Sequence, residues 1–151
     1  MAVSRGMRRL LSVLEAQEER YRAEMETARK DLNELDQMLA EAADRERGGR
    51  QSVTASALTN ELAQRIVGLE EVRAGRRQAE LLQPRIADAE ARAGARREEF
   101  LSKRIERRQA ETAVEKAEVQ EAIEAGRRGQ QALDDWFLGK ARQSQITNRE
   151  E

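Results

Sequence analysis

The sequence predicts an all-α fold, an elongated antiparallel coiled-coil hairpin of two helices in which the second helix is longer than the first. Three observations predict it: a heptad stripe near the N-terminus, a helix-forming composition and one strong loop signal. Of the 151 residues, 38% are charged, 3% are aromatic and one is proline. A compact domain of this length would normally contain more large apolar residues. We therefore expect a single coiled-coil hairpin spanning residues 1–151.

The heptad stripe defines the first helix, which we expect over about residues 7–45. Its positions alternate in spacing between four and three, so their mean period keeps one side of the helix facing a partner helix. Only Glu18 interrupts the apolar series. The stripe consists of Met7, Leu11, Leu14, Glu18, Tyr21, Met25, Ala28, Leu32, Leu35, Leu39 and Ala42.

The strongest loop signal is the pair Gly48 and Gly49, which polar residues follow. Glycine is unfavourable inside a helix and common in turns, so we expect a loop over about residues 46–54. Thr54 and Ser56 are the candidate N-caps of the next helix. A short loop between two long helices makes them antiparallel neighbours.

The second helix is expected over about residues 55–138, followed by a flexible tail over residues 139–151. Pro84 predicts a kink within this helix, or alternatively a turn that would make the hairpin more symmetric. Arg76 interrupts the seam that faces the first helix. We expect that seam to consist of Leu58, Leu62, Leu69, Val72, Ala79, Leu82, Ile86, Ala89 and Ala93.

The first helix is long enough to cover only the first half of the second. From about Arg96 onward, the apolar stripe of the second helix is weaker, with polar residues at several of its positions. Trp136 and Phe137 form the main aromatic cluster near its end. Tryptophan is enriched at binding hot spots, which favours a partner contact. The alternative is that both rings pack on the start of the first helix, near Leu10, Leu11 and Leu14.

The composition argues against several classes of function. The chain has no cysteine and no histidine, which excludes disulfides, the usual zinc ligands and histidine proton transfer. Its carboxylate pairs have no cleft that would shift their pKa values, so we expect no enzyme activity, cofactor or metal. Acidic residues interleave with the arginine pairs and the net charge is −1, so we expect no nucleic-acid partner.

The N-terminal segment predicts neither a signal peptide nor a membrane span. No apolar run approaches the roughly 20 residues that cross a bilayer. Arg5, Arg8 and Arg9 precede a short apolar stretch that Glu15 ends. We expect a cytoplasmic protein with no direct membrane insertion. Surface binding to a membrane through these arginines is a weaker alternative, because stable anchoring usually needs a second signal.

Two end segments carry a resemblance to a known family. The segment Arg8–Glu15 is a short basic start that leads into the heptad helix, and Gln130–Phe137 reads Gln-Gln-Ala-Leu-Asp-Asp-Trp-Phe. With the polar glycine loop a third of the way along, the chain resembles the central stalk proteins of bacterial type III secretion, the YscO/FliJ-like family. The terminal Leu-Asp-Asp-Trp-Phe is closer to the injectisome branch than to the flagellar branch.

The resemblance implies a non-enzymatic stalk, cytoplasmic and peripheral at the inner-membrane secretion apparatus. Its open end, which carries both termini, would sit in the pore of a hexameric secretion ATPase and stimulate or couple ATP hydrolysis. Other implied partners are the cytoplasmic domain of the export gate and secretion chaperones, with the stalk a monomer or weakly self-associating. The ATPase-contact residues would be Arg8, Arg9, Leu11, Arg127, Arg128, Trp136 and Phe137. The export-gate contacts would be Leu62, Ile66, Leu69 and Arg73, which match the family's spacing but not its usual residue types.

A generic structural coiled coil is the competing interpretation. A scaffold or chaperone-like protein would share the stripe, the loop and the charge pattern, because these are not unique to secretion stalks. It predicts a stable homodimer or larger bundle that covers the second half of the second helix. The stalk interpretation instead predicts a protein that binds an ATPase.

Overall fold

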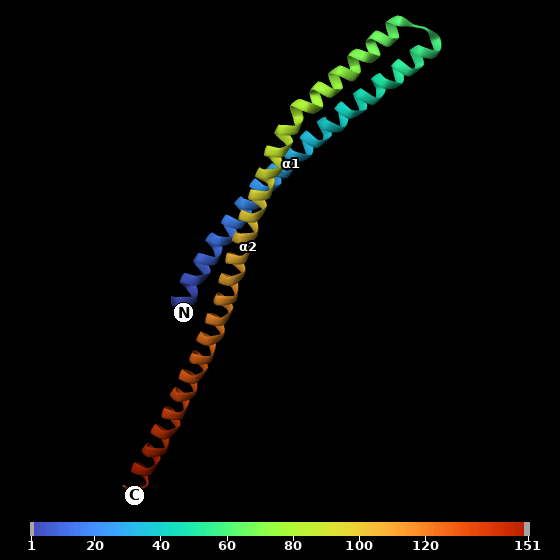
Figure 1. Cartoon of the computed structure of the whole chain (residues 1–151). Coiled ribbons are helices and arrows are strands. Elements are labelled where there is room, and N and C mark those ends of the chain that lie inside the picture. The colour runs from blue at the N-terminus through green and yellow to red at the C-terminus, as the bar shows by residue number, and fades with distance from the viewer. Residues whose placement is uncertain (1, 150–151) are drawn as a thin grey trace. The chain divides into compact units, whose positions relative to one another are not determined.

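A computed structural model describes residues 2–149 and shows two antiparallel helices (Figure 1). Helix α1 spans Ala2–Thr59 and helix α2 spans Leu62–Thr147. The predicted all-α hairpin with a longer second helix is therefore confirmed. The contacts divide the chain into two compact units: the hairpin unit, residues 17–103, and the terminal unit, residues 1–16 with 104–151. Neither described helix has a stretch long and apolar enough to cross a membrane.

Helix α1 continues through the segment that the sequence analysis assigns to a loop, so the predicted end near residue 45 is wrong. The alternation of four and three simply continues after Ala42, at Glu46, Gly49, Val53 and Ser56. Ala42, Gly49 and Ser56 are all buried. Gly49 is therefore an interior position of the coiled coil, and the heptad pattern overrides the low helix propensity of glycine.

The two candidate N-caps lie inside α1. The Thr54 hydroxyl donates to the Arg50 carbonyl at 3.0 Å, and the Ser56 hydroxyl donates to the Val53 carbonyl at 2.7 Å. Both bonds run back along the same helix, which is the usual way for a mid-helix serine or threonine to satisfy its hydroxyl. Neither residue begins a helix.

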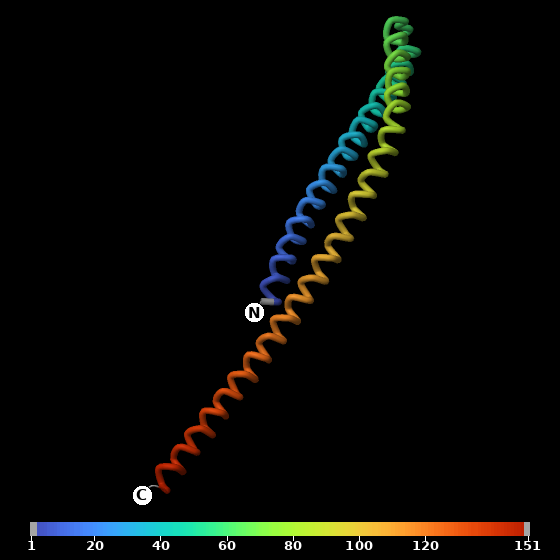
Figure 2. The backbone as a smooth tube through the Cα atoms, turned by 90° about the vertical axis from the view of Figure 1, so that its left-hand side faces the viewer, coloured from blue at the N-terminus to red at the C-terminus, as the bar shows by residue number. Residues whose placement is uncertain are grey.

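The turn consists of Asn60 and Glu61, where Figure 2 shows the backbone reversing direction. Asn60 has a φ of 57°, the left-handed conformation that ends many helices. Asparagine tolerates this conformation better than most residues. The amide of Arg65 donates to the Glu61 carbonyl at 3.2 Å and completes the first turn of α2. The turn therefore contains neither glycine nor proline. For that reason the sequence carries only a weak signal for a turn at this position.

Glycines bring the two backbones into direct contact beside this turn. An added Cβ at Gly49 would lie 2.6 Å from the carbonyl oxygen of Gly68, and one at Gly68 would lie 2.8 Å from that of Gly49. At Gly75 it would lie 2.7 Å from the Ala42 oxygen. Real Cβ atoms essentially never approach this closely, so only glycine fits these three positions without a shift of the backbone.

The predicted seam of α2 is correct from Val72 onward and wrong before it. Leu58 belongs to α1, and Leu58, Leu62 and Leu69 are all exposed, whereas Gly68 is buried. Gly75, not the neighbouring Arg76, occupies the position where the predicted seam appeared to be interrupted. Glycine carries no apolar side chain, so a search for apolar stripes passes over it.

Larger side chains form the interior farther from the turn, and Pro84 does not end α2. Leu35, Leu82, Ile86 and Ala89 form a buried cluster, with Leu32 and Leu39 packed against it. Phe100 is also buried, and the guanidinium of Arg22 lies 5.5 Å from its ring centroid. Because α2 is continuous through Pro84, the alternative of a turn there is wrong.

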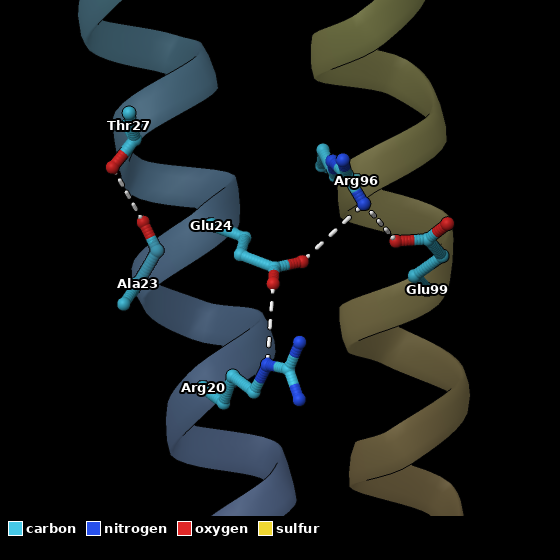
Figure 3. A network of polar contacts seen from close by, with 6 residues as sticks. All are labelled: Arg20, Ala23, Glu24, Thr27, Arg96 and Glu99. Carbon is cyan, nitrogen blue, oxygen red and sulfur yellow. Dashed lines mark hydrogen bonds and ion pairs between the residues drawn. The ribbon is translucent and has the colours of Figure 1, made fainter.

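Charged side chains bridge the two helices along the edges of the hairpin unit. Figure 3 shows Glu24 accepting from Arg96 of the other helix at 3.3 Å and from Arg20 at 3.4 Å. Arg96 also donates to Glu99 at 3.0 Å, and that bond is the largest cause that raises the Arg96 pKa. Nearer the turn, Arg45 pairs with Glu71 and Arg76 pairs with Glu46. Such exposed pairs contribute little energy individually but favour one register of the helices.

In the terminal unit, the first residues of α1 pack on the middle of α2. The Ser4 hydroxyl donates to a Glu121 carboxylate oxygen at 2.7 Å, and Arg8 pairs with Glu118. Val114 of α2 is buried beside them. From Ala122 onward the described residues of α2 are all exposed, and the helix continues to Thr147. Residues 139–147 of the predicted flexible tail are therefore helical, and residues 150–151 of that tail lie outside the described residues.

We predict that Gly75→Ala destabilises the hairpin by roughly 1–3 kcal/mol, because the new methyl group must push the backbone of Ala42 away. Chemical denaturation followed by circular dichroism measures the change. Gly94→Ala is the matched control, because an added Cβ at Gly94 meets nothing within 4 Å. It should stabilise α2 by roughly 0.5–1 kcal/mol. Equal effects of the two substitutions would contradict close packing at Gly75.

We also predict that acid weakens the pairs nearest the turn. Hydrogen bonds from Arg76 and Arg45 are the largest causes that lower the pKa values of Glu46 and Glu71 below 4.5. Their stabilising contribution is therefore complete above the unfolded pKa and is lost as the pH falls through the lower folded values. The unfolding midpoint of the wild type should fall more between about pH 5 and pH 3 than that of a Glu46→Gln, Glu71→Gln double variant. Parallel pH profiles would contradict this.

Candidate partner-binding surfaces

Large apolar side chains gather on the outside of the hairpin beside the turn. Leu58 is 86% exposed and Leu62 is 68% exposed, and Ile66, Val67 and Leu69 are exposed as well. We call these five residues the turn surface. They point outward because glycine and other small residues occupy the seam. Leu62, Ile66 and Leu69 share one side of α2 by their spacing, and exposed apolar residues grouped in this way commonly mark an interaction site.

The predicted export-gate residues lie on or beside the turn surface. Leu62, Ile66 and Leu69 belong to it, and Arg73 follows at the next step of the alternating four and three spacing. Arg73 is exposed and forms an ion pair with Glu70 of its own helix at 3.0 Å. The structure therefore brings these four side chains together on one exposed face of α2. Leu58 and Val67 extend this surface, but the first was assigned to the seam and the second was not singled out.

Part of the predicted ATPase-contact set surrounds a groove in the terminal unit. Arg5 and Arg8 of α1 and Arg128 of α2 line this groove, whose walls also include Glu118 and Glu121. Arg8 pairs with Glu118, and Arg128 lies 3.7 Å from Glu124. The remaining lining residues are Ser4, Ala122 and Ala125. The groove therefore combines three arginines and two glutamates with small residues.

The other predicted members of this set differ in their exposure. Arg9 and Arg127 are exposed. Leu11 is half-buried at a seam position of α1, so its main contact is with α2 and little of its surface is free for a partner. Ser4 was not among the predicted contact residues, but its hydroxyl and its amide both bind Glu121 and hold the start of α1 in place. The heptad spacing could have indicated it, because Ser4 lies one step before Met7.

Trp136 and Phe137 are exposed on a part of α2 that α1 does not reach. Trp136 is 55% exposed and Phe137 is 61% exposed. Their ring centroids lie 5.0 Å apart in an edge-to-face arrangement, and the ammonium of Lys140 lies 4.6 Å from the Trp136 centroid. The first residues of α1 contact Glu121, and Trp136 lies roughly 22 Å farther along the helix. The alternative that the rings pack on the start of α1 is therefore wrong.

The exposure of the turn surface predicts a small stability cost for substitutions there. We predict that Leu62→Ser with Leu69→Ser changes the free energy of unfolding by less than about 1 kcal/mol, because both side chains already face solvent. Leu82→Ala, within the buried cluster, should cost roughly 2–5 kcal/mol. Denaturation of the three proteins compares these costs. A large loss of unfolding free energy in the Leu62, Leu69 variant would contradict their exposure and would indicate that both side chains pack in the seam.

These surfaces are suited to binding other macromolecules through shape, apolar contact and charge. Within residues 2–149, no group of three or more Asp, Glu, His or Cys side chains is placed to hold a metal ion. Three of the grooves along the two helices are lined mainly by charged and small residues. No protein family, no curated protein and no solved structure matches this chain.

Proposed function

We propose that the protein is the non-enzymatic central stalk of a type III secretion ATPase complex. The proposal rests on the resemblance of the chain to the YscO/FliJ-like stalk proteins and on its hairpin fold. One structural observation carries it further than the sequence does. The aromatic residues Trp136 and Phe137 are exposed near the end of a helix that α1 leaves uncovered, where they are available to a partner.

In this proposal, the C-terminal part of α2 enters the pore of the hexameric ATPase. An asymmetric helix inside a six-fold ring contacts each subunit differently. A ligand that binds two conformations unequally shifts their populations, so such contacts bias the nucleotide-dependent states of the subunits. Apolar contacts from the two rings and ionic contacts from Arg8, Arg127 and Arg128 would carry this binding. The stalk itself forms and breaks no covalent bond, and it needs no cofactor.

The turn surface is the proposed contact with the cytoplasmic domain of the export gate. Leu62, Ile66 and Leu69 offer apolar area, and Arg73 adds one charge at its edge. Secretion chaperones are a further proposed class of partner. The protein would then act in the cytoplasm, at the periphery of the inner-membrane secretion apparatus, and would connect ATPase and gate through a single hairpin.

A generic structural coiled coil remains the second candidate function. The observation that favours it is the amount of exposed apolar surface on the second half of α2, which includes Val119, Ile123 and Leu133. A scaffold would cover this surface in a tight homodimer and would bind no ATPase. The two candidates therefore differ in whether the purified protein binds and stimulates a secretion ATPase.

We predict that the wild-type chain increases ATP hydrolysis by its cognate secretion ATPase and that Trp136→Ala with Phe137→Ala reduces this stimulation several-fold. Loss of two exposed aromatic contacts weakens binding but should leave the helix intact, because alanine has a high helix propensity. Steady-state ATPase assays measure the effect, and circular dichroism confirms helicity. Gln130→Ala with Gln131→Ala is the matched control on the same helix. Full stimulation by the folded aromatic variant would refute the proposed pore contact.

A further inference from the structure

One face of α2 lacks charged residues over several turns and has no partner among the described residues. It consists of Val119, Ala122, Gly126, Gly129, Leu133 and Trp136, whose spacing alternates between three and four. All six residues are exposed. Ile123 and Phe137, also exposed, flank them. We call these eight residues the α2 face. The next positions of the same alternation, Glu115 and Lys140, carry its first charges.

The α2 face lies next to the side of α2 that contacts α1, and the two meet at Ala122, which lines a groove with Ser4 and Arg8. The residues of that side in the terminal unit include Val114, which is buried, and Ala117 and Glu121, which are half-buried. Each residue of a helix advances by about 100°, so Gly126 and Leu133 point well away from Val114 and Glu121. All eight residues of the α2 face are exposed, so α1 does not cover it.

Glycines on this face resemble the glycines that the hairpin unit uses for backbone contact. Gly68, Val72 and Gly75 have the spacing four then three, and so do Ala122, Gly126 and Gly129. An added Cβ at Gly68 or Gly75 would collide with α1, whereas at Gly126 or Gly129 it would meet nothing within 4 Å. Each exposed helical glycine costs roughly 1 kcal/mol relative to alanine. Close approach of another helix would account for that cost at Gly126 and Gly129.

The arrangement of large and small residues makes the face complementary to itself. Its first part contains Ala122, Gly126 and Gly129, and its last part contains Leu133 and Trp136. Two copies related by a two-fold axis, with antiparallel α2 helices, place the large residues of one against the smaller residues of the other. The facing pairs are Gly126 with Gly129, Ala122 with Leu133 and Val119 with Trp136.

Charge selects the same arrangement. In the antiparallel register, Glu115 of one copy faces Lys140 of the other, so the charges at both ends of the face are paired. A parallel arrangement would place Glu115 against Glu115 and Lys140 against Lys140, and like charges at facing positions are destabilising. It would also place Trp136 against Trp136, which crowds the interface, and Gly126 against Gly126, which leaves a gap between the helices.

We propose that the α2 face binds a second copy of this chain, and that the two α2 helices pair antiparallel between Glu115 and Lys140. The paired segment is roughly 38 Å long. Such a contact lies near the small end of the ~1,200–2,000 Å² buried in stable interfaces, so the dimer dissociates on dilution. The inference does not depend on the proposed stalk function. If both hold, self-association competes with ATPase binding, because both use Trp136.

Sedimentation velocity of the full chain over a range of concentrations tests the pairing. The wild type should shift from monomer to dimer as its concentration rises through roughly 10–100 µM. Gly126→Arg should keep the chain monomeric, because it places a large charge where two backbones meet. Gln131→Arg is the control with the same charge on the opposite side of α2, and it should dimerise as the wild type does. Circular dichroism verifies that both variants remain helical.

Disulfide formation tests the register, since the natural chain contains no cysteine to interfere. A mixture of Ala122→Cys and Leu133→Cys chains should form the mixed disulfide several times faster than either chain forms one with itself. Ala122→Cys with Ala122→Cys would instead predominate in a parallel pair. A wild type that stays monomeric at every concentration, a dimer that Gly126→Arg leaves intact, or a predominance of self-disulfides would each overturn the proposal.

Discussion

The contact of two helix backbones at glycine is the constraint on which the hairpin depends. At Gly49, Gly68 and Gly75 the helices approach so closely that even a methyl group would have to displace a neighbour. Each glycine weakens its own helix, since it costs roughly 1 kcal/mol relative to alanine. The compensation comes from dispersion between two surfaces in direct contact and from the heptad repeat that continues on either side. Close packing thus replaces a large apolar core in the part of the hairpin nearest the turn.

This packing also explains the surface chemistry. Because the seam near the turn needs no large side chains, the leucines and the isoleucine of that region are free to face outward, and they form the turn surface. Farther from the turn, Leu35, Leu82 and Ile86 return to the interior and the outside becomes mainly charged. In the terminal unit, the apolar side facing α1 ends near Glu121, and a different side of α2 carries the aromatic residues.

The heptad stripe from Met7 to Ala42 was sufficient to predict the fold class, because the period of apolar residues directly reflects which side of a helix is covered. The same reasoning failed where the covered residues are glycine and serine. Gly48 and Gly49 suggested a loop because their propensity was weighed without their heptad position, and the true turn at Asn60 carries no strong signal. Exposed residues such as Trp136 and Ile66 could be named from their type. Whether α1 covers these residues could not be predicted from their type, because that depends on where the turn places the two helices.

The shortness of the turn has a mechanical consequence. The two turn residues leave three Cα–Cα steps between Thr59 and Leu62, which span at most about 11 Å and must already cross from one helix to the other, whereas a slip of one heptad would add about 10 Å along the helix axis. The helices of the hairpin unit therefore cannot change register without unwinding at Thr59 or Leu62. A pull or a twist applied to one helix is passed to its neighbour across the glycine contacts and is not absorbed by sliding. The hairpin unit can thus transmit a displacement as a single element.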